Sequence, residues 1–332
     1  MTSPQTRTIP VQRSSFSAVG ERYGLPVLLL VIIVFFAVLP ASSSTFFSPA
    51  NLSVVLANQS VVMLCAIAVM IPLITGNFDF SVGANTVVAA MVCAGAQAQL
   101  QLPVPVAILL ALAAGALVGL INGWLVAVVG LDAFITTLGV ATALAGLVQW
   151  YSGGLPIYGI DPSMIAFGSQ TWLGLPMVLY VVIVVFAIIW YVLTWTPFGR
   201  RLYAVGSNRR AADLVGISAP RLTLVGFVLA GTLAGVAGVL LSARTGGANP
   251  SAGTELLFPA LAAFFLGATA IRPGRFNIVG TIIGVLFVAV AVSGLTLAGA
   301  QSWVDSVFNG VALVIAVFVS TYLRRRREGS AR

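Results

Sequence analysis

Long apolar runs alternate with short polar clusters along this chain. No Asp, Glu or Arg occurs in residues 23–78, 80–131 or 162–199. A helix needs about 20 residues to cross about 30 Å of hydrocarbon, so most of these runs are long enough for more than one membrane span. Turn-forming clusters divide the runs. The pattern predicts ten spans, at residues 23–40, 52–74, 80–98, 104–129, 133–151, 172–195, 222–243, 256–271, 276–298 and a tenth that ends at Leu323.

Two longer connections interrupt this pattern. Residues 152–171 form a polar segment with Gly and Pro, which predicts a loop, and residues 196–221 form the one long charged connection. We therefore expect an all-α integral membrane protein. Residues 23–323 would form one transmembrane domain, between a tail of residues 1–22 and a basic tail of residues 324–332.

The placement of arginine predicts the orientation. The chain has 16 basic residues, all of them arginine. If both termini are cytoplasmic, 15 of these arginines lie on the cytoplasmic side and Arg244 lies outside, as the positive-inside rule requires. The formal charge of +8 is then explained by orientation, and we predict no nucleic-acid partner.

Composition agrees with a surface that faces lipid. Hydrophobic residues make up 59% of the chain and charged residues 7%, whereas soluble domains carry about 25% charged residues. Both cysteines, Cys65 and Cys93, lie in apolar stretches, so we interpret them as packing residues rather than as a disulfide or a metal site. Glycines four residues apart in the spans at 104–129, 222–243 and 276–298 predict close helix packing.

The order of the spans suggests an internal repeat. Spans two to five begin outside and spans seven to ten begin inside, which is typical of an inverted repeat. Asp79 and Glu255 would then open the third and eighth spans in comparable places. Asp79 is predicted to accept hydrogen bonds from the first N–H groups of its helix, where the helix dipole favours a negative charge.

Several kinds of chemistry are excluded or disfavoured. Without lysine the chain cannot supply a phosphate-binding P-loop, and it has no histidine to relay protons. No carboxylate pair or metal-ligand cluster indicates catalysis, so a membrane enzyme is a remote alternative. Carboxylates lie near the span ends or in loops, which disfavours an ion-coupled carrier. If a solute moves uphill through this chain, another subunit must supply the energy.

The charged connection contains a short predicted helix. Asn208 is a suitable N-cap for a helix over residues 209–215, and Gly216 is a suitable stop. Ala211 and Ala212 give this helix a small surface between charged residues. Such a helix fits a cleft on a partner protein, although its arginines would also suit lipid headgroups.

Five segments carry a resemblance to a known family. They are residues 198–217, the Gly-Asn-Phe-Asp-Phe-Ser-Val-Gly run at 76–83, the Phe-Ile-Thr-Thr-Leu-Gly run at 134–139, residues 255–267, and the Gly-Thr-Ile-Ile-Gly run at 280–284. Taken in their order along the chain, these segments resemble the sugar-type permeases of ABC importers, the ribose, xylose and autoinducer-2 branch. Asn77 and Phe78 depart from the family's Gly-Ile, and Arg272 and Arg275 stand in place of a Gly-rich turn.

The resemblance implies a set of partners and a site. In that family two permease subunits pair, as homo- or heterodimers, with cytoplasmic ABC ATPases that hold ATP and Mg²⁺ and with an extracytoplasmic sugar-binding protein. This chain itself would hold no cofactor and would lie in the bacterial inner membrane. By resemblance, the ATPase-coupling residues are Gly206, Asn208, Arg209, Ala211, Ala212, Asp213, Gly216 and Ile217, and the structural motif comprises Asp79, Ser81, Gly83 and Glu255.

The solute path is expected to use uncharged polar and aromatic groups within the spans. A polyol needs hydrogen bonds and stacking but no counter-ion. The candidates are Asn58, Gln59, Asn85, Asn122, Thr136, Thr137, Gln149 and Trp150. For each of these residues, hydrogen bonding between helices is an equally ordinary reason for a polar side chain within a span. The sequence thus indicates a permease subunit of an ATP-driven sugar importer, with a stand-alone channel or facilitator as the alternative.

Overall fold

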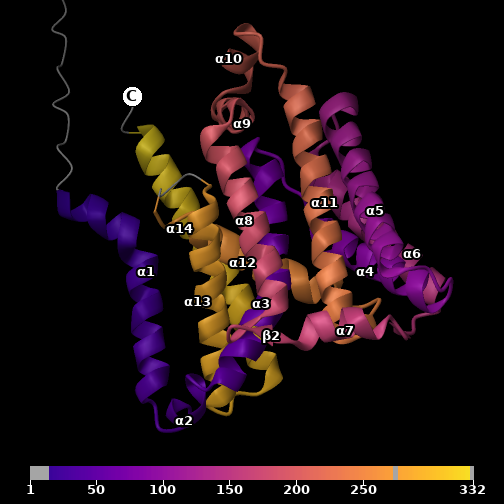
Figure 1. Ribbon diagram of the computed structural model, residues 1–332. Helices are drawn as coiled ribbons and strands as arrows, with labels where there is room; N and C mark the ends of the chain where they lie inside the picture. The colour runs from indigo at the N-terminus through magenta and orange to yellow at the C-terminus, as the bar shows by residue number, and fades with distance from the viewer. Residues whose placement is uncertain (1–14, 272–275, 330–332) are drawn as a thin grey trace, which may run out of the picture.

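The chain folds into a bundle of long helices (Figure 1). The computed structural model describes residues 15–271 and 276–329. The ends of the predicted tails (1–14 and 330–332) and the predicted cytoplasmic arginines Arg272 and Arg275 lie outside the described residues. In chain order the elements are α1 (Ser15–Val38), α2 (Ser43–Phe46), α3 (Pro49–Ile74), α4 (Val82–Ala98), α5 (Val104–Trp124), the π-helical turn η1 (Leu125–Val129), α6 (Ala133–Ser152), β1 (Ile157–Tyr158), α7 (Pro162–Ser169), β2 (Thr171–Trp172), β3 (Leu175–Pro176), α8 (Met177–Trp195), α9 (Pro197–Ser207), α10 (Arg209–Leu214), α11 (Ala219–Thr245), β4 (Gly247–Ala248), α12 (Gly253–Gly267), α13 (Ile278–Leu297) and α14 (Ser302–Gly329).

The helices account for the predicted membrane character. Within the described part of the chain, six helical stretches are long and apolar enough to cross a bilayer: α3, α5 with η1, α6, α8, α11 and α13. Four shorter apolar helices, at residues 22–38, 82–98, 253–267 and 303–319, coincide with the other predicted spans. The prediction of an all-α membrane protein is therefore confirmed at this level.

Two predictions about the connections were wrong. The predicted loop at 152–171 contains helix α7, which Asp161 caps by accepting from the amide of Ser163 and which has Pro162 at its first position. The predicted sixth span starts too early, because residues 171–176 form the hairpin β2–β3. Leu173 and Gly174 have positive φ angles, +49° and +80°, so no α-helix can run through them.

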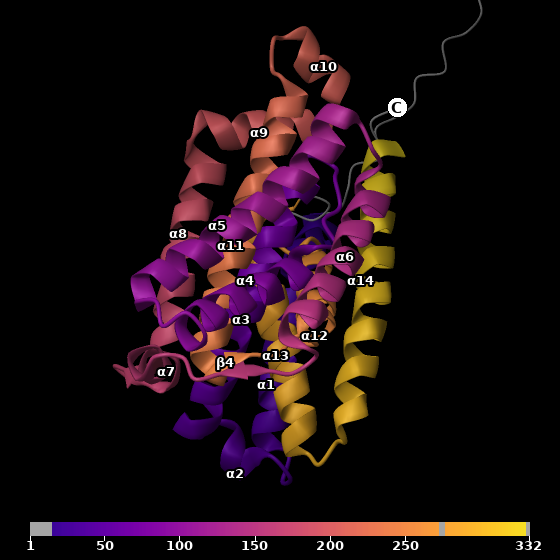
Figure 2. The ribbon, with the colours of Figure 1, turned by 90° about the vertical axis from the view of Figure 1, so that its right-hand side faces the viewer.

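The helices share two common ends (Figures 1 and 2). Helices α9 and α10 lie at one end, together with the start of α1 and the end of α14, and we name this the α10 end. Helices α2 and α7 lie at the opposite end, the α7 end. The short pairing of β1 with β4 is antiparallel and lies beside α7.

A close seam between α5 and α11 organises the core. Helix α11 packs against α3, α4 and α5. A Cβ added at Gly115 would lie 2.5 Å from the carbonyl oxygen of Gly231, and one added at Gly119 would lie 2.3 Å from that of Phe227. The two backbones therefore touch, as the glycine spacing predicted. On α13, Gly280 and Gly284 contact the α12 backbone in the same way.

Helices α4 and α12 begin beside each other inside the bundle. A Cβ at Gly83, in the first turn of α4, would lie 2.3 Å from the carbonyl oxygen of Gly253, where α12 starts. Helix α6 packs on α4, α4 on α12, and α12 on α14, which makes a continuous row of four helices. Both α6 and α14 lie along the right-hand edge of Figure 2.

Candidate functional site

The charged connection forms two helices rather than one. Asn208 accepts a hydrogen bond from the amide of Ala211 at 3.0 Å and caps α10, as predicted. Gly216 follows α10 with φ +80°, which suits a residue without a Cβ. The sequence reasoning missed α9. Its signal was the run Thr196-Pro197, because Thr196 accepts from the amide of Gly199 at 3.4 Å and Pro197 opens the helix.

The outer surface of α10 differs from the predicted one. Ala212 is buried against Val205 and Ala219, so it packs inward rather than toward a partner. Asp213 accepts from the amide of Ala219 at 3.2 Å, which ties α10 to the start of α11. The exposed apolar side chains are instead Leu214 and Val215, 88% and 74% exposed, which the sequence reasoning missed.

The coupling residues predicted by resemblance are all brought together at the α10 end. Arg209, Arg210 and Ala211 are exposed, whereas Ile217 is half-buried. Helix α10 stands at the tip of the molecule (Figure 1), and it carries the exposed Arg209 and Arg210 together with the exposed Leu214, which Val215 follows. An apolar tip within a basic rim suits a protein surface with an apolar pocket and acidic edges.

Helix α9 lies directly on the end of α3. A Cβ added at Gly206 would lie 1.7 Å from the carbonyl oxygen of Ile74, so the α9 backbone touches the last turn of α3. Leu202 is fully buried beside this contact, and the hydroxyl of Tyr203 donates to the carbonyl oxygen of Phe276 at 3.0 Å. The charged connection is thus seated on the bundle at more than one point.

The predicted structural motif divides into two environments. Asp79 is buried and accepts from both the amide and the hydroxyl of Ser81, at 2.9 and 2.6 Å, just before α4 starts at Val82. Glu255, in contrast, is exposed in the first turn of α12. The two carboxylates therefore do not occupy equivalent places, although Gly83 meets the start of α12 closely.

Three predicted path residues are buried and hydrogen-bonded to other parts of the bundle. Asn85 donates to the carbonyl oxygen of Gly115 at 3.1 Å, and Asn122 donates to the hydroxyl of Ser81 at 2.7 Å. Thr137 is fully buried, donates to the carbonyl oxygen of Ala133 at 2.8 Å and accepts from the amide of Phe80 at 3.0 Å. Because they are enclosed, these three residues fit the alternative role of joining helices.

The other candidates are more accessible. Asn58 is exposed and accepts a hydrogen bond from Arg244, the one arginine that the predicted orientation puts on the outer side. Gln149 is exposed on α6, with its amide nitrogen 3.5 Å from the hydroxyl of Ser251. Trp150 is 79% exposed. Thr136 and Gln59 are half-buried, and the side-chain oxygen of Gln59 has no hydrogen-bond partner among the described residues.

Helix α14 contributes polar groups that the sequence reasoning missed. Asp305 and Asn309 stand four residues apart, on one face of α14. One side-chain oxygen of each is buried and has no hydrogen-bond partner among the described residues. The spacing of a carboxylate and an amide in an otherwise apolar helix was the signal available in the sequence.

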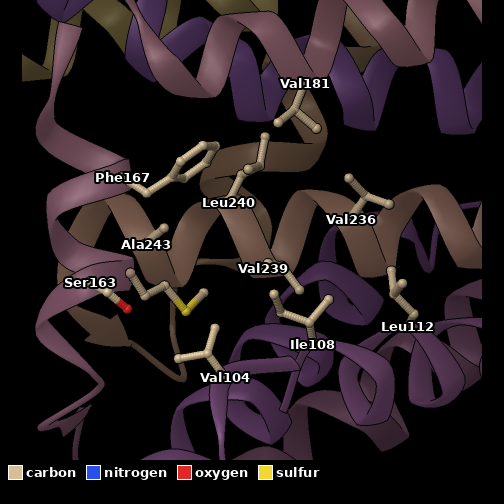
Figure 3. A pocket seen from close by; sticks show the side chains of 11 residues that line it. Val104, Ile108, Leu112, Ser163, Phe167, Val181, Val236, Val239, Leu240 and Ala243 are labelled. Atoms are coloured by element: carbon tan, nitrogen blue, oxygen red, sulfur yellow. The ribbon is translucent and has the colours of Figure 1, made fainter. Parts of the chain in front are cut away.

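Two cavities differ in character. The first, of about 430 Å³, lies between α5, α7, α8 and α11, and the side chains around it are apolar except for Ser163 (Figure 3). It offers almost no hydrogen bonds to a polar solute. The second, of about 190 Å³, lies between the end of α11 and the start of α12, where Thr245, Asn249 and Glu255 supply polar groups.

Asp161, outside the spans, titrates abnormally. The hydroxyl of Ser163 donates to its carboxylate at 2.5 Å and the amide of Ser163 donates to the same oxygen at 2.8 Å. These two hydrogen bonds hold the pKa of Asp161 below its usual value, because they favour the ionised form. Asp161 therefore stays charged at the N-terminus of α7, where the helix dipole also favours an anion.

Within residues 15–271 and 276–329, no group of three or more His, Cys, Asp and Glu side chains is placed to hold a metal ion. Cys65 and Cys93 are both buried and unbonded to each other, as predicted for packing residues. The polar groups of the described bundle are arranged to join helices and to line surfaces.

Comparison with known proteins assigns the chain to a family. A family model described as "Branched-chain amino acid transport system / permease component" matches residues 51–317. The chain is 35% identical to the ribose import permease protein of Bacillus subtilis (strain 168), over 93% of this chain and 95% of that protein. It is 33% identical to the ribose import permease protein of Escherichia coli (strain K12), over 88% and 92%.

Other relatives carry different sugars in their names. The chain is 30% identical to the fructose import permease protein of Rhizobium meliloti, over 91% of this chain and 85% of that protein. No solved structure matches the chain. The matches cover nearly the whole chain, and they confirm the family resemblance that the sequence shows. The chain therefore belongs to the permease family of ABC import systems, as a transport subunit rather than an enzyme.

Proposed function

We propose that the chain is the membrane-spanning subunit of an ATP-driven, binding-protein-dependent importer for a sugar or sugar-like solute. The observation that carries the proposal is the α9–α10 segment, with an exposed apolar tip among arginines at one end of a bundle that has no nucleotide motif of its own. Relatives named as ribose and fructose import permeases support a sugar as the solute.

We further propose ten membrane passes with both termini in the cytoplasm. The six long spans and four shorter apolar helices supply ten segments. The start of α1 and the end of α14 lie at the α10 end, which agrees with the arginine distribution (Figure 1). On this proposal α10 faces the cytoplasm and α7 faces the outside of the bacterial inner membrane.

An inverted repeat of α3–α6 and α11–α14 is part of the same proposal. Helices α3 and α4 begin at Pro49 and Val82, and α11 and α12 begin about 170 residues later, at Ala219 and Gly253. Helix α4 packs on α5 and α6, as α12 packs on α13 and α14. Two short helices that start together inside the bundle are typical of transporters built from such repeats.

For the solute path we propose the row α6–α4–α12–α14. This row would face a second permease subunit that lies beside it in the same membrane. Gln149 and Trp150 are exposed on α6, and Asn249 and Glu255 line the small polar cavity at the start of α12. These groups offer the hydrogen bonds and the stacking surface that a polyol needs. ATP and Mg²⁺ would be held by the partner ATPases, and an external binding protein would deliver the solute at the α7 end.

Purification of the tagged chain from its native cells tests the proposal. We expect ATPase subunits to co-purify. Replacing Leu214 by Asp should reduce the co-purified ATPase about tenfold or more, because a charge would enter an apolar contact. The matched control is Leu173→Asp, an equally exposed leucine in the hairpin near the α7 end.

Uptake into proteoliposomes separates the proposal from a channel. With the ATPases and binding protein present, ribose, allose and fructose serve as probes, and one of them should accumulate only with ATP. A stand-alone channel or facilitator would equilibrate the solute without ATP. Accumulation against a gradient by the chain alone, with no ATPase, would overturn the proposal.

A further inference from the structure

The connection between α3 and α4, residues 75–81, contacts four helices in its few residues. It begins directly after Ile74, whose carbonyl oxygen lies against Gly206 of α9. It ends at Ser81, whose hydroxyl accepts from Asn122 of α5 at 2.7 Å. Between these points the ring of Phe78 stacks on Phe265 of α12, with ring centres 6.3 Å apart. The connection is therefore an irregular segment packed among these helices, with Asp79 and Ser81 buried.

Helix α6 holds the middle of this connection through one side chain. The hydroxyl oxygen of Thr137 accepts from the amide of Phe80 at 3.0 Å and lies 3.4 Å from the carbonyl oxygen of Phe78. One residue of the connection and one of α6 also meet edge to face, since the rings of Phe80 and Phe134 are 4.9 Å apart. Within a membrane protein, irregular backbone must find hydrogen bonds inside the protein, and Thr137 supplies one here.

Most of the remaining α6 surface is exposed in the chain. All residues of α6 are described, and the buried ones are Thr137 and Val148. Thr137 lies one turn from the start of α6, and Val148 lies one turn from its end. A helix with so few buried side chains has little packing within the chain that would oppose its movement as a rigid body, which is how packed elements usually respond to a displaced neighbour.

We propose that the α3–α4 connection transmits the displacement of α9 to α6, and that Thr137 is the positioning residue that fastens α6 to it. The inference rests on the proposed function, in which ATPases move the α9–α10 segment. When α9 moves, its residue Gly206 presses on Ile74 at the end of α3. The connection that follows Ile74 is then displaced together with the end of α3. Because Thr137 and Phe134 contact the connection, its displacement also moves α6. The side of the solute path that α6 forms moves with this helix.

The alternative is that Thr137 only stabilises the fold. The chain offers a matched control on the same helix, because the hydroxyl of Thr142 donates to the carbonyl oxygen of Leu138 at 2.9 Å and Thr142 is exposed. Thr137→Val removes the hydroxyl with little change in shape. Thr137→Ser keeps the hydroxyl and should restore function, whereas Thr142→Val should behave as the unsubstituted chain.

The experiment uses the complete complex in proteoliposomes, with spin labels at Ser207→Cys on α9 and Leu147→Cys on α6. We expect vanadate-trapped nucleotide to change the distance between the labels in the unsubstituted, Thr137→Ser and Thr142→Val proteins. In Thr137→Val this change should be lost, and uptake per ATP hydrolysed, measured with the probe sugar that the unsubstituted complex accumulates, should fall about tenfold while the ATPase rate stays within about twofold.

Two outcomes overturn the inference. One is a Thr137→Val protein whose α6 label moves as in the unsubstituted protein. The other is a Thr137→Val protein that loses uptake and ATPase activity together with its thermal stability, because that result indicates a structural role. Failure of the proposed function is recognised separately: the unsubstituted chain would then purify without ATPase, or Leu214→Asp would leave the co-purified ATPase unchanged.

Discussion

Helix α5 meets α11 through glycine backbones, whereas α6, which follows α5 in the chain, has an exposed surface along most of its length. At the seam, atoms of the main chain touch and no side chain can adjust. On α6, Gly139 and Gly146 have no described atom within 4 Å of an added Cβ. The same residue type therefore serves close packing in one helix and leaves an open surface in its neighbour. The seam between α5 and α11 therefore suits a rigid part of the molecule, which we call the frame. Helix α6 suits a part that moves relative to this frame.

The largest effect should come from replacing one glycine by alanine, which adds a single methyl group. Gly119→Ala should destabilise the protein by about 1–3 kcal/mol or more, because the new Cβ would lie 2.3 Å from the carbonyl oxygen of Phe227 and the two backbones would have to move apart. Gly139→Ala should instead stabilise it by about 0.5–1 kcal/mol, since alanine favours a helix over glycine where space is free. Thermal unfolding in detergent measures both. Equal effects at the two positions would contradict the distinction.

Buried and exposed polar groups give the next test. Ser81→Ala should cost about 1–3 kcal/mol of stability, because Asp79 loses a hydrogen-bond donor and Asn122 loses its acceptor in a buried site. Gln149→Ala, on the exposed side of α6, should change stability by less than about 0.5 kcal/mol and yet lower uptake of the probe sugar that the unsubstituted complex accumulates. Unfolding and uptake are measured on both variants. If Gln149→Ala were the more destabilising change, α6 would belong to the frame.

Local signals in the sequence predicted a large part of this structure. Asn208 and Gly216 mark the ends of α10 because caps and positive φ angles depend on a few neighbouring residues. The spacing of Gly115 and Gly119 likewise predicted a close helix contact. Thr137 and Asn122 were not distinguishable from path residues, because a polar group in an apolar span serves packing or solute equally well until its neighbours are known. The outward direction of Leu214 and the inward direction of Ala212 depend on how α10 sits on α9 and α11.

Helix α7 packs beside the seam between α5 and α11, and the stability of its first turn should depend weakly on pH. Gly168 lies against the backbone of Ala243 in α11, so α7 packs on the α11 side of the seam. The pKa of Asp161 is lowered in the folded protein, first by the hydroxyl and then by the amide of Ser163. The stabilisation is therefore present at neutral pH and is lost as pH falls below the usual aspartate range and through the folded pKa.

Amide hydrogen exchange at Ser163 measures this effect, which should be small because Asp161 is exposed. Exchange, corrected for the intrinsic pH dependence, should speed up as Asp161 is protonated. Asp161→Asn is the matched control, since the asparagine oxygen still accepts from the Ser163 amide but does not titrate in this range. The variant should therefore show slow exchange without the acid-dependent step. The same step in the variant would mean that another group controls the first turn of α7, and that the edge of the frame does not depend on this carboxylate.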